Sequence, residues 1–62
     1  MNTKLQQVMQ QNGDSQQDLA NYLGLRGYQS IYKRMYGKTP WTKDEIEKVC
    51  KKYKKTKEQL GF

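Results

Sequence analysis

Glycine-containing breaks divide this chain into stretches that have room for only a few helical turns each. Within the stretches, apolar residues recur at spacings of three and four, which is the period of an α-helix with one buried face. No segment shows the sustained alternation of a half-buried strand. Glycine favours the left-handed conformation that often follows a helix C-terminus, so these breaks are expected to end helices. They are centred on Gly13, Gly24, Gly37 and Gly61.

Each stretch carries an apolar stripe of its own, and together the stripes predict the core. We expect a compact, all-α, five-helix fold that forms one domain over residues 1–62, with Leu60 and Phe62 folding back onto the core. The stripes consist of Leu5, Val8 and Met9; Leu19, Ala20 and Leu23; Ile31 and Met35; and Ile46, Val49, Cys50 and Tyr53. The helices are expected at residues 2–12, 15–23, 28–36, 42–53 and 56–60.

Helix starts are marked by residues whose side chains can accept hydrogen bonds from free backbone amides. Ser15 stands before the second stripe, and Thr56 opens the short last helix. Thr42 and Glu45 have the spacing of a capping box, in which each side chain bonds the backbone of the other residue. Trp41, directly before that start, is expected to form part of a hydrophobic staple, the alternative being an aromatic contact at an interface.

A chain of 62 residues with one Cys and no His has few catalytic or metal-binding chemistries available. One thiol forms neither an internal disulfide nor a multi-Cys zinc site, and the usual general base near neutral pH is missing. Cys50 lies in the fourth stripe and is interpreted as a buried, unreactive thiol. No apolar run approaches the roughly 20 residues of a membrane span, and no signal-peptide core follows Met1. We therefore expect a cytoplasmic binding module that is not an enzyme and has no cofactor, no metal and no membrane partner.

Positive charge is concentrated in the middle of the chain. The net charge is +6, from 12 Lys and Arg against 6 Asp and Glu. Residues 1–25 have a net charge of −1 and residues 44–62 of +2, whereas residues 26–43 carry +5 without a single acid. Such a block suits a polyanionic partner, the plainer alternative being a solvated lysine surface. Its members are Arg26, Lys33, Arg34, Lys38 and Lys43.

Four segments follow one another in an order that is known from a protein family. Ser15–Leu25 reads SQQDLANYLGL, Ile31–Lys38 reads IYKRMYGK, Trp41–Ile46 reads WTKDEI and Thr56–Phe62 reads TKEQLGF. They resemble, in turn, the S/T-Q-x-x-L-A-x-x-L-G-hydrophobic run, the helix ending in x-G-K, the hydrophobic-T-x-x-E-I helix start and the S-x-x-x-L-x-F ending of the Cro/CI-type helix-turn-helix proteins. This family, also called the xenobiotic-response-element type, includes small phage repressors, and the resemblance covers nearly the whole chain.

The resemblance implies a lambda-repressor-like helix-turn-helix domain, with residues 15–23 as its second helix and residues 28–36 as its recognition helix. In this fold the recognition helix lies in the major groove of DNA, and its first residues face the base edges. Family members usually place four residues between the hydrophobic turn residue and the first buried position of that helix, whereas five separate Leu25 from Ile31. The extra residue either lengthens the turn or tilts the helix, so the base contacts are placed only to within one residue.

The expected recognition helix contains side chains that suit base edges. Gln29 can bond adenine in a bidentate way, Lys33 can reach guanine, and Tyr32 offers a ring to thymine methyls or a hydroxyl to phosphate. The expected base-reading residues are Tyr28, Gln29, Ser30, Tyr32 and Lys33. The residues expected at the DNA backbone are Gln16, which the resemblance places against a phosphate, and Arg26, Arg34, Lys38, Thr39 and Lys43.

Each of these assignments has a plainer alternative. Tyr28 and Tyr32 are equally consistent with core packing, and Gln29 and Ser30 with a solvated first turn. The later lysines either extend the DNA-binding surface or lie on the far side of the molecule as solvated charge, which we favour. These are Lys51, Lys52, Lys54 and Lys55.

The sequence thus predicts a sequence-specific double-stranded DNA-binding transcriptional regulator, a phage or prophage repressor or Cro-like protein acting by operator occupancy at the nucleoid. A weak or DNA-assisted homodimer is expected, because one short helix makes only a handful of base contacts. The alternative is a phage antirepressor-like module that binds a partner repressor protein through the same fold. A basic peptide lying on membranes is disfavoured, since separately capped short helices indicate a packed globule.

Overall fold

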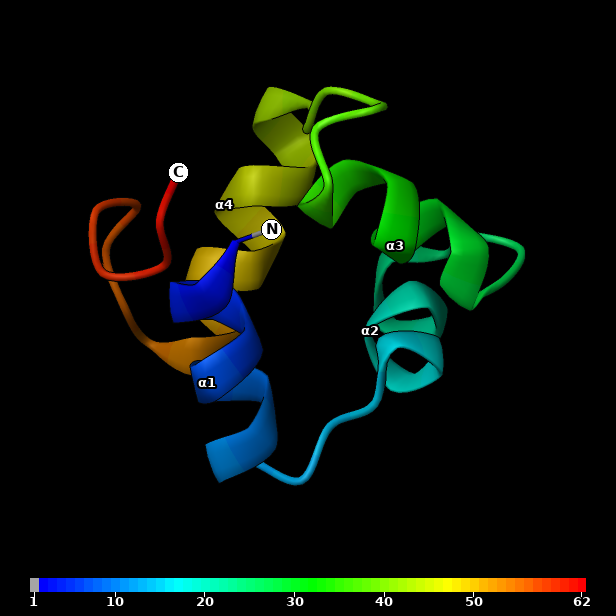
Figure 1. Cartoon of the computed structure of the whole chain (residues 1–62). Helices are drawn as coiled ribbons and strands as arrows, with labels where there is room; N and C mark the ends of the chain where they lie inside the picture. The colour runs from blue at the N-terminus through cyan, green and yellow to red at the C-terminus, as the bar shows by residue number, and fades with distance from the viewer. Residues whose placement is uncertain (1) are drawn as a thin grey trace.

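Four α-helices make up the secondary structure in a computed structural model that describes residues 2–62 (Figure 1). They are α1 (Thr3–Gln11), α2 (Gln16–Leu23), α3 (Tyr28–Met35) and α4 (Lys43–Tyr53). No strand occurs between residues 2 and 62, so the predicted all-α class is confirmed. Helices α2 and α3 pack against each other on one side of the molecule, while α1, α4 and the C-terminal segment lie on the other side (Figure 1). The body measures 24 × 22 × 20 Å.

Local sequence signals account for where the helices begin. Thr42 is the N-cap of α4, its hydroxyl accepts from the Glu45 amide at 3.2 Å, and the Glu45 carboxylate accepts from the Thr42 amide at 3.0 Å. The predicted capping box is therefore confirmed. Ser15 caps α2 in the same reciprocal way with Asp18, at 3.1 Å and 2.9 Å. The left-handed Gly24 ends α2 at φ 75°, a conformation that a residue with a Cβ adopts only with strain.

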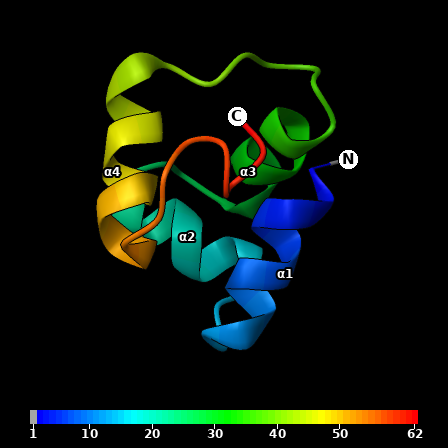
Figure 2. The ribbon, with the colours of Figure 1, turned by 90° about the vertical axis from the view of Figure 1, so that its left-hand side faces the viewer.

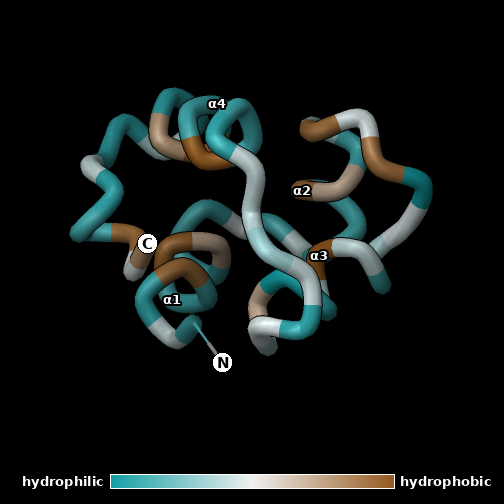
Figure 3. Tube along the Cα trace, turned by 90° about the horizontal axis from the view of Figure 1, so that it is seen from above, coloured by the Kyte–Doolittle hydropathy of each residue, from teal (hydrophilic) through white to brown (hydrophobic). Residues whose placement is uncertain are grey.

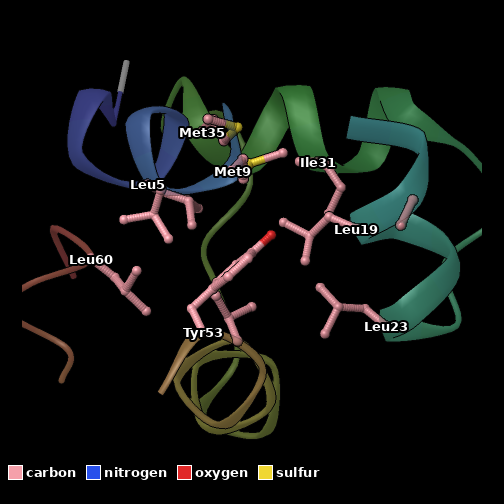
Figure 4. Packing of buried hydrophobic residues seen from close by; sticks show 11 residues of the cluster. Leu5, Met9, Leu19, Leu23, Ile31, Met35, Tyr53 and Leu60 are labelled. Carbon is pink, nitrogen blue, oxygen red and sulfur yellow. The ribbon is translucent and has the colours of Figure 1, made fainter. Parts of the chain in front are cut away.

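The predicted apolar stripes meet in one core. Figure 4 shows side chains of α1, α2, α3 and α4 pointing toward one another, and Figure 3 shows the hydrophobic parts of α1 and α4 face to face. Every residue of the first three stripes is buried, whereas in α4 only Val49 and Tyr53 are buried and Ile46 and Cys50 stay partly exposed. The core consists of Leu5, Val8, Met9, Leu19, Ala20, Leu23, Ile31, Met35, Val49, Tyr53 and Leu60.

The predicted fifth helix at residues 56–60 is wrong, because this segment forms a single hydrogen-bonded turn. Its expected cap is present, since Thr56 and Gln59 exchange side chain to backbone hydrogen bonds at 2.9 and 3.2 Å. The turn does not propagate because Gly61 already has a left-handed φ of 78°. A single helical turn fixes the backbone angles of several residues but forms few hydrogen bonds, so tertiary contacts are needed to stabilise it. As predicted, Leu60 is fully buried and Phe62 packs against the core.

Asn2 ties the C-terminal segment to the start of α1 and the end of α3. Its backbone N–H donates to the Met35 carbonyl at 3.1 Å, and its Nδ2 donates to the Leu60 carbonyl at 2.7 Å. Its Oδ1 accepts from the Leu5 amide and so caps α1. A Cβ at Gly61 would overlap the Asn2 side chain, which explains why glycine stands there. Figure 2 shows the result from the side, with the C-terminal segment lying between α4 and α1.

None of the helices in the described part of the chain has both the length and the apolar character that crossing a bilayer requires.

Candidate nucleic-acid interface

One face of α3 is buried and the opposite face is open to solvent. Ile31 and Met35 point into the core at 0% and 4% exposure. Beside this buried face, Tyr28 and Tyr32 are 52% and 40% exposed, which contradicts the alternative that they pack in the core. Gln29 and Lys33 are also exposed, while Ser30 is half-buried. Of the five residues expected to read bases, four therefore share an accessible surface.

The N-terminal end of α3 is held by a side chain of α2. The N-cap residue, Gly27, offers no side chain to cap the helix. The Tyr28 N–H instead donates to Oε1 of Gln17 at 3.2 Å, and Nε2 of Gln17 donates to Oδ1 of Asn21 at 3.0 Å. Gln17 was not among the residues singled out from the sequence. A glycine at an N-cap is the signal that could have found it, because a free first-turn amide has to find its acceptor elsewhere.

The C-terminal half of α3 is joined to the start of α4 by an ion pair. Nε of Arg34 lies 3.0 Å from Oε1 of Glu45, and Nη1 of Arg34 donates to the Ser30 carbonyl at 3.0 Å. The two charged side chains are only 14% and 13% exposed. Arg34 was expected at the DNA backbone, but the structure places its guanidinium between two helices, where it orients α3. We leave it out of the candidate interface for this reason.

Glu45 is the acidic partner in both the ion pair and the capping box. Burial raises the pKa of its carboxyl, but hydrogen bonds from the Thr42 amide and from Arg34 outweigh burial and lower the pKa below its ordinary value. A backbone hydrogen bond from Ser15 likewise lowers the pKa of Asp18 in the cap of α2. Both carboxyls are thus held in their charged form by the folded chain.

We expect the free energy of unfolding to fall as the pH drops below the ordinary Glu pKa of 4.5. A carboxyl whose pKa is lower in the folded state contributes its full stability above the unfolded value and loses it as the pH falls through the folded value. Urea unfolding between about pH 7 and about pH 2 measures this. Glu45→Gln should be less stable near neutral pH and lose less on acidification. Glu47→Gln, at an exposed position of α4, is the control, and a Glu45→Gln curve parallel to wild type would contradict the assignment.

Four cations on α3 or on the segments directly before and after it have no carboxylate partner in residues 2–62. Their side chains are all at exposed positions. The chain after α3 folds back onto it, because the amides of Lys38 and Thr39 both donate to the Lys33 carbonyl, at 2.8 and 3.3 Å. This turn brings Lys38 to the C-terminal end of α3. The four cations are Arg26, Lys33, Lys38 and Lys43.

Gln16 and Thr39, which were also expected at the DNA backbone, are half-buried. Gln16 is the first residue of α2 and lines a hollow of about 180 Å³ together with Met9 and Met35. The one ionisable side chain among its lining residues is Asp14, whose carboxylate is already bonded by Tyr53 and Lys52. The hollow therefore suggests no ligand.

The lysine-rich C-terminal end of α4 contacts the loop between α1 and α2 through Asp14. Nζ of Lys52 lies 3.4 Å from Oδ2 of Asp14, and the Tyr53 hydroxyl donates to the same oxygen at 2.8 Å. The pKa of the Tyr53 hydroxyl is raised above its ordinary value, mainly by burial and secondly by this hydrogen bond to Asp14. The Lys52 ammonium also lies 4.9 Å from the ring centroid of Tyr22. This end of α4 is remote from α3 (Figure 1), in keeping with the interpretation of these lysines as far-side charge.

No protein-family model, curated protein or solved structure matches the chain. Within residues 2–62, no group of three or more His, Cys, Asp or Glu side chains is placed to hold a metal ion.

Proposed function

We propose that the protein is a sequence-specific double-stranded DNA-binding regulator of transcription, a lambda-repressor-like helix-turn-helix domain of the Cro/CI type. The observation that carries this proposal is the open face of α3, which presents Gln29 and Lys33 within a stretch, residues 26–43, that holds four unpaired cations and no acid. In this assignment α2, the connection Gly24–Gly27 and α3 form the helix-turn-helix. The protein acts by occupying an operator at the nucleoid, without catalysis, and so excludes polymerase or a rival regulator.

The dimensions of α3 suit the major groove of B-DNA. An α-helix with its side chains is about 10–12 Å across, and the groove is about 12 Å wide. With the exposed face turned to the bases, Gln29 in the first turn offers a donor and an acceptor to adenine, and Lys33 offers donors to the N7 and O6 of guanine. Arg26 and Lys38, just beyond the two ends of α3, and Lys43, at the start of α4, are then available for phosphates.

Specific recognition calls for two copies. The longest dimension of the body is 24 Å, which is less than the roughly 34 Å of one helical turn of DNA. One copy therefore contacts a single stretch of major groove, and a handful of base contacts gives little discrimination against genomic competitors. We propose that two copies bind half-sites one turn apart as a weak or DNA-assisted dimer.

One observation favours a second candidate function, binding to a partner repressor protein as a phage antirepressor does. Four tyrosines are between 40% and 52% exposed, and tyrosine is enriched at protein interfaces. They are Tyr22, Tyr28, Tyr32 and Tyr36. The absence of any acid from residues 26–43 makes DNA the better-supported partner, because a duplex is uniformly negative whereas a protein surface is mixed.

Selection of bound duplexes from random DNA tests the proposal. Wild type should enrich a short motif, and Gln29→Ala should relax the preference at one position of it. Lys33→Ala should do the same at another position, whereas a lysine that contacts only phosphate would weaken binding to all sequences alike. Gln7→Ala, at an exposed position of α1, is the matched control and should enrich the wild-type motif. If wild type enriches no motif, the DNA-binding proposal is wrong and the partner-repressor function is favoured.

A further inference from the structure

Three exposed tyrosines follow one another at successive helical turns along one side of α3, between its buried face and the residues Gln29 and Lys33. Tyr28, Tyr32 and Tyr36 are 52%, 40% and 47% exposed, and we refer to them as the tyrosine stripe. Their spacing of four residues places them above one another on a helix. Tyr36, at the C-cap of α3, was not among the residues expected to contact DNA. A large aromatic surface left open to water on three consecutive turns calls for a partner.

Two members of the stripe are already in contact. The rings of Tyr32 and Tyr36 have centroids 4.4 Å apart and planes inclined by 34°. Each ring therefore restricts the rotamers of the other, so less side-chain entropy is lost when a partner packs against them. The two rings form one apolar surface more than a single side chain wide, beside the ammonium-bearing Lys33.

Only one apolar group is present on the base edges of the major groove. Adenine, guanine and cytosine offer donors and acceptors there, and thymine adds its C5-methyl group. A pair of tyrosine rings can bury such a methyl while the phenolic hydroxyls stay in contact with water or phosphate. The charges around the stripe suit a duplex, because residues 26–43 contain no acid and Lys33, Arg26 and Lys38 are unpaired.

We propose that the tyrosine stripe reads thymine, by packing the Tyr32 and Tyr36 rings against its C5-methyl group next to the base pairs that Gln29 and Lys33 contact. This inference rests on the proposed DNA-binding function and adds its substrate class, duplex half-sites with thymine methyls at fixed positions. Gln29 and Lys33 supply hydrogen bonds to purines, and the stripe supplies the apolar contact that they lack.

Substituting deoxyuridine for each thymine of the selected duplex tests the proposal, because it removes one methyl and leaves the base pairing intact. Binding is measured by fluorescence anisotropy. Wild type should lose about three- to tenfold in affinity at one or two thymines, as expected for one methyl group withdrawn from an apolar contact. The proposal would be overturned if wild type bound every deoxyuridine duplex as tightly as the duplex that keeps all its thymines, whatever the variants show.

Four variants test whether the rings are responsible. Tyr32→Ala and Tyr36→Ala should bind the thymine and deoxyuridine duplexes alike, while Tyr32→Phe, which keeps the ring, should still discriminate. Tyr22→Ala removes a tyrosine that is 47% exposed but lies on α2, and it should behave as wild type. Discrimination that survives in both alanine variants of the stripe would overturn the proposal. Discrimination lost in Tyr32→Phe would assign the effect to the hydroxyl and overturn it too.

Two outcomes distinguish a failure of DNA binding from a failure of thymine recognition. If random DNA yields no enriched motif, the proposed function and the reading of thymine both fall, and the tyrosine stripe becomes a protein-binding surface. If a motif is enriched but its thymine methyls contribute nothing, DNA binding stands and only the role of the stripe is wrong.

Discussion

Leu60→Ala should lower the free energy of unfolding by about 2–5 kcal/mol, the usual cost of removing most of a buried leucine. Leu60 is fully buried and is the core residue that the single turn after α4 supplies. Domains of this size rarely have more than about 3–5 kcal/mol of stability from one core. The substitution should therefore leave a large unfolded fraction in water, which circular dichroism during urea unfolding would measure.

The loss should also reach the end of α3. Asn2 bonds both the Leu60 carbonyl and the Met35 carbonyl, so a loosened C-terminal turn withdraws support from the residue that links it to α3. Lys57→Ala, at an exposed position in the same turn, is the control and should unfold within error of wild type. An unfolding midpoint of Leu60→Ala equal to that of Lys57→Ala would show that the turn is dispensable for the fold.

Local interactions explain what could be predicted from the sequence. The capping box of Thr42 and Glu45 involves residues three positions apart, so its spacing alone located the start of α4 to within one residue. The apolar stripes of α1, α2 and α3 could be predicted equally well, because apolar residues spaced by three and four lie on the same face of a helix and that face is buried. The prediction of a fifth helix was wrong because the capping residues Thr56 and Gln59 indicate only that a first turn forms. They do not indicate whether a second turn follows it.

Contacts between helices explain what could not be predicted. Arg34 belongs to the basic block by composition, but its partner Glu45 lies eleven residues further on, in another helix. The acceptor for the Tyr28 amide is likewise a side chain of α2, eleven residues earlier. The helical spacing of the apolar residues predicted that Ile31 and Met35 are buried, but it did not decide whether Tyr28 and Tyr32 lie in the core or on the surface. Which bases Gln29 and Lys33 contact stays a prediction.

Binding of the protein to its selected duplex should weaken steeply with salt. Phosphate contacts release condensed counterions, and the logarithm of affinity falls against the logarithm of salt concentration with a slope of about −0.9 per contact. The three unpaired cations assigned to phosphates, Arg26, Lys38 and Lys43, predict a slope of about −2.7 for each bound copy, on the order of a fortyfold loss between about 50 and about 200 mM salt. Titrations by fluorescence anisotropy at several salt concentrations measure this slope.

Position, not total charge, should decide that slope, and two matched double variants separate the two. Lys38→Ala with Lys43→Ala and Lys51→Ala with Lys57→Ala each reduce the net charge from +6 to +4. The first pair lies in the connection after α3 and at the first residue of α4, whereas the second lies in the last turn of α4 and in the turn that follows it, segments that are remote from α3 (Figure 1). The first double variant should lose about two units of slope and the second almost none, since each released counterion belongs to a contact. Equal slopes for both would mean that the duplex responds to overall charge and that α3 has no privileged place in binding.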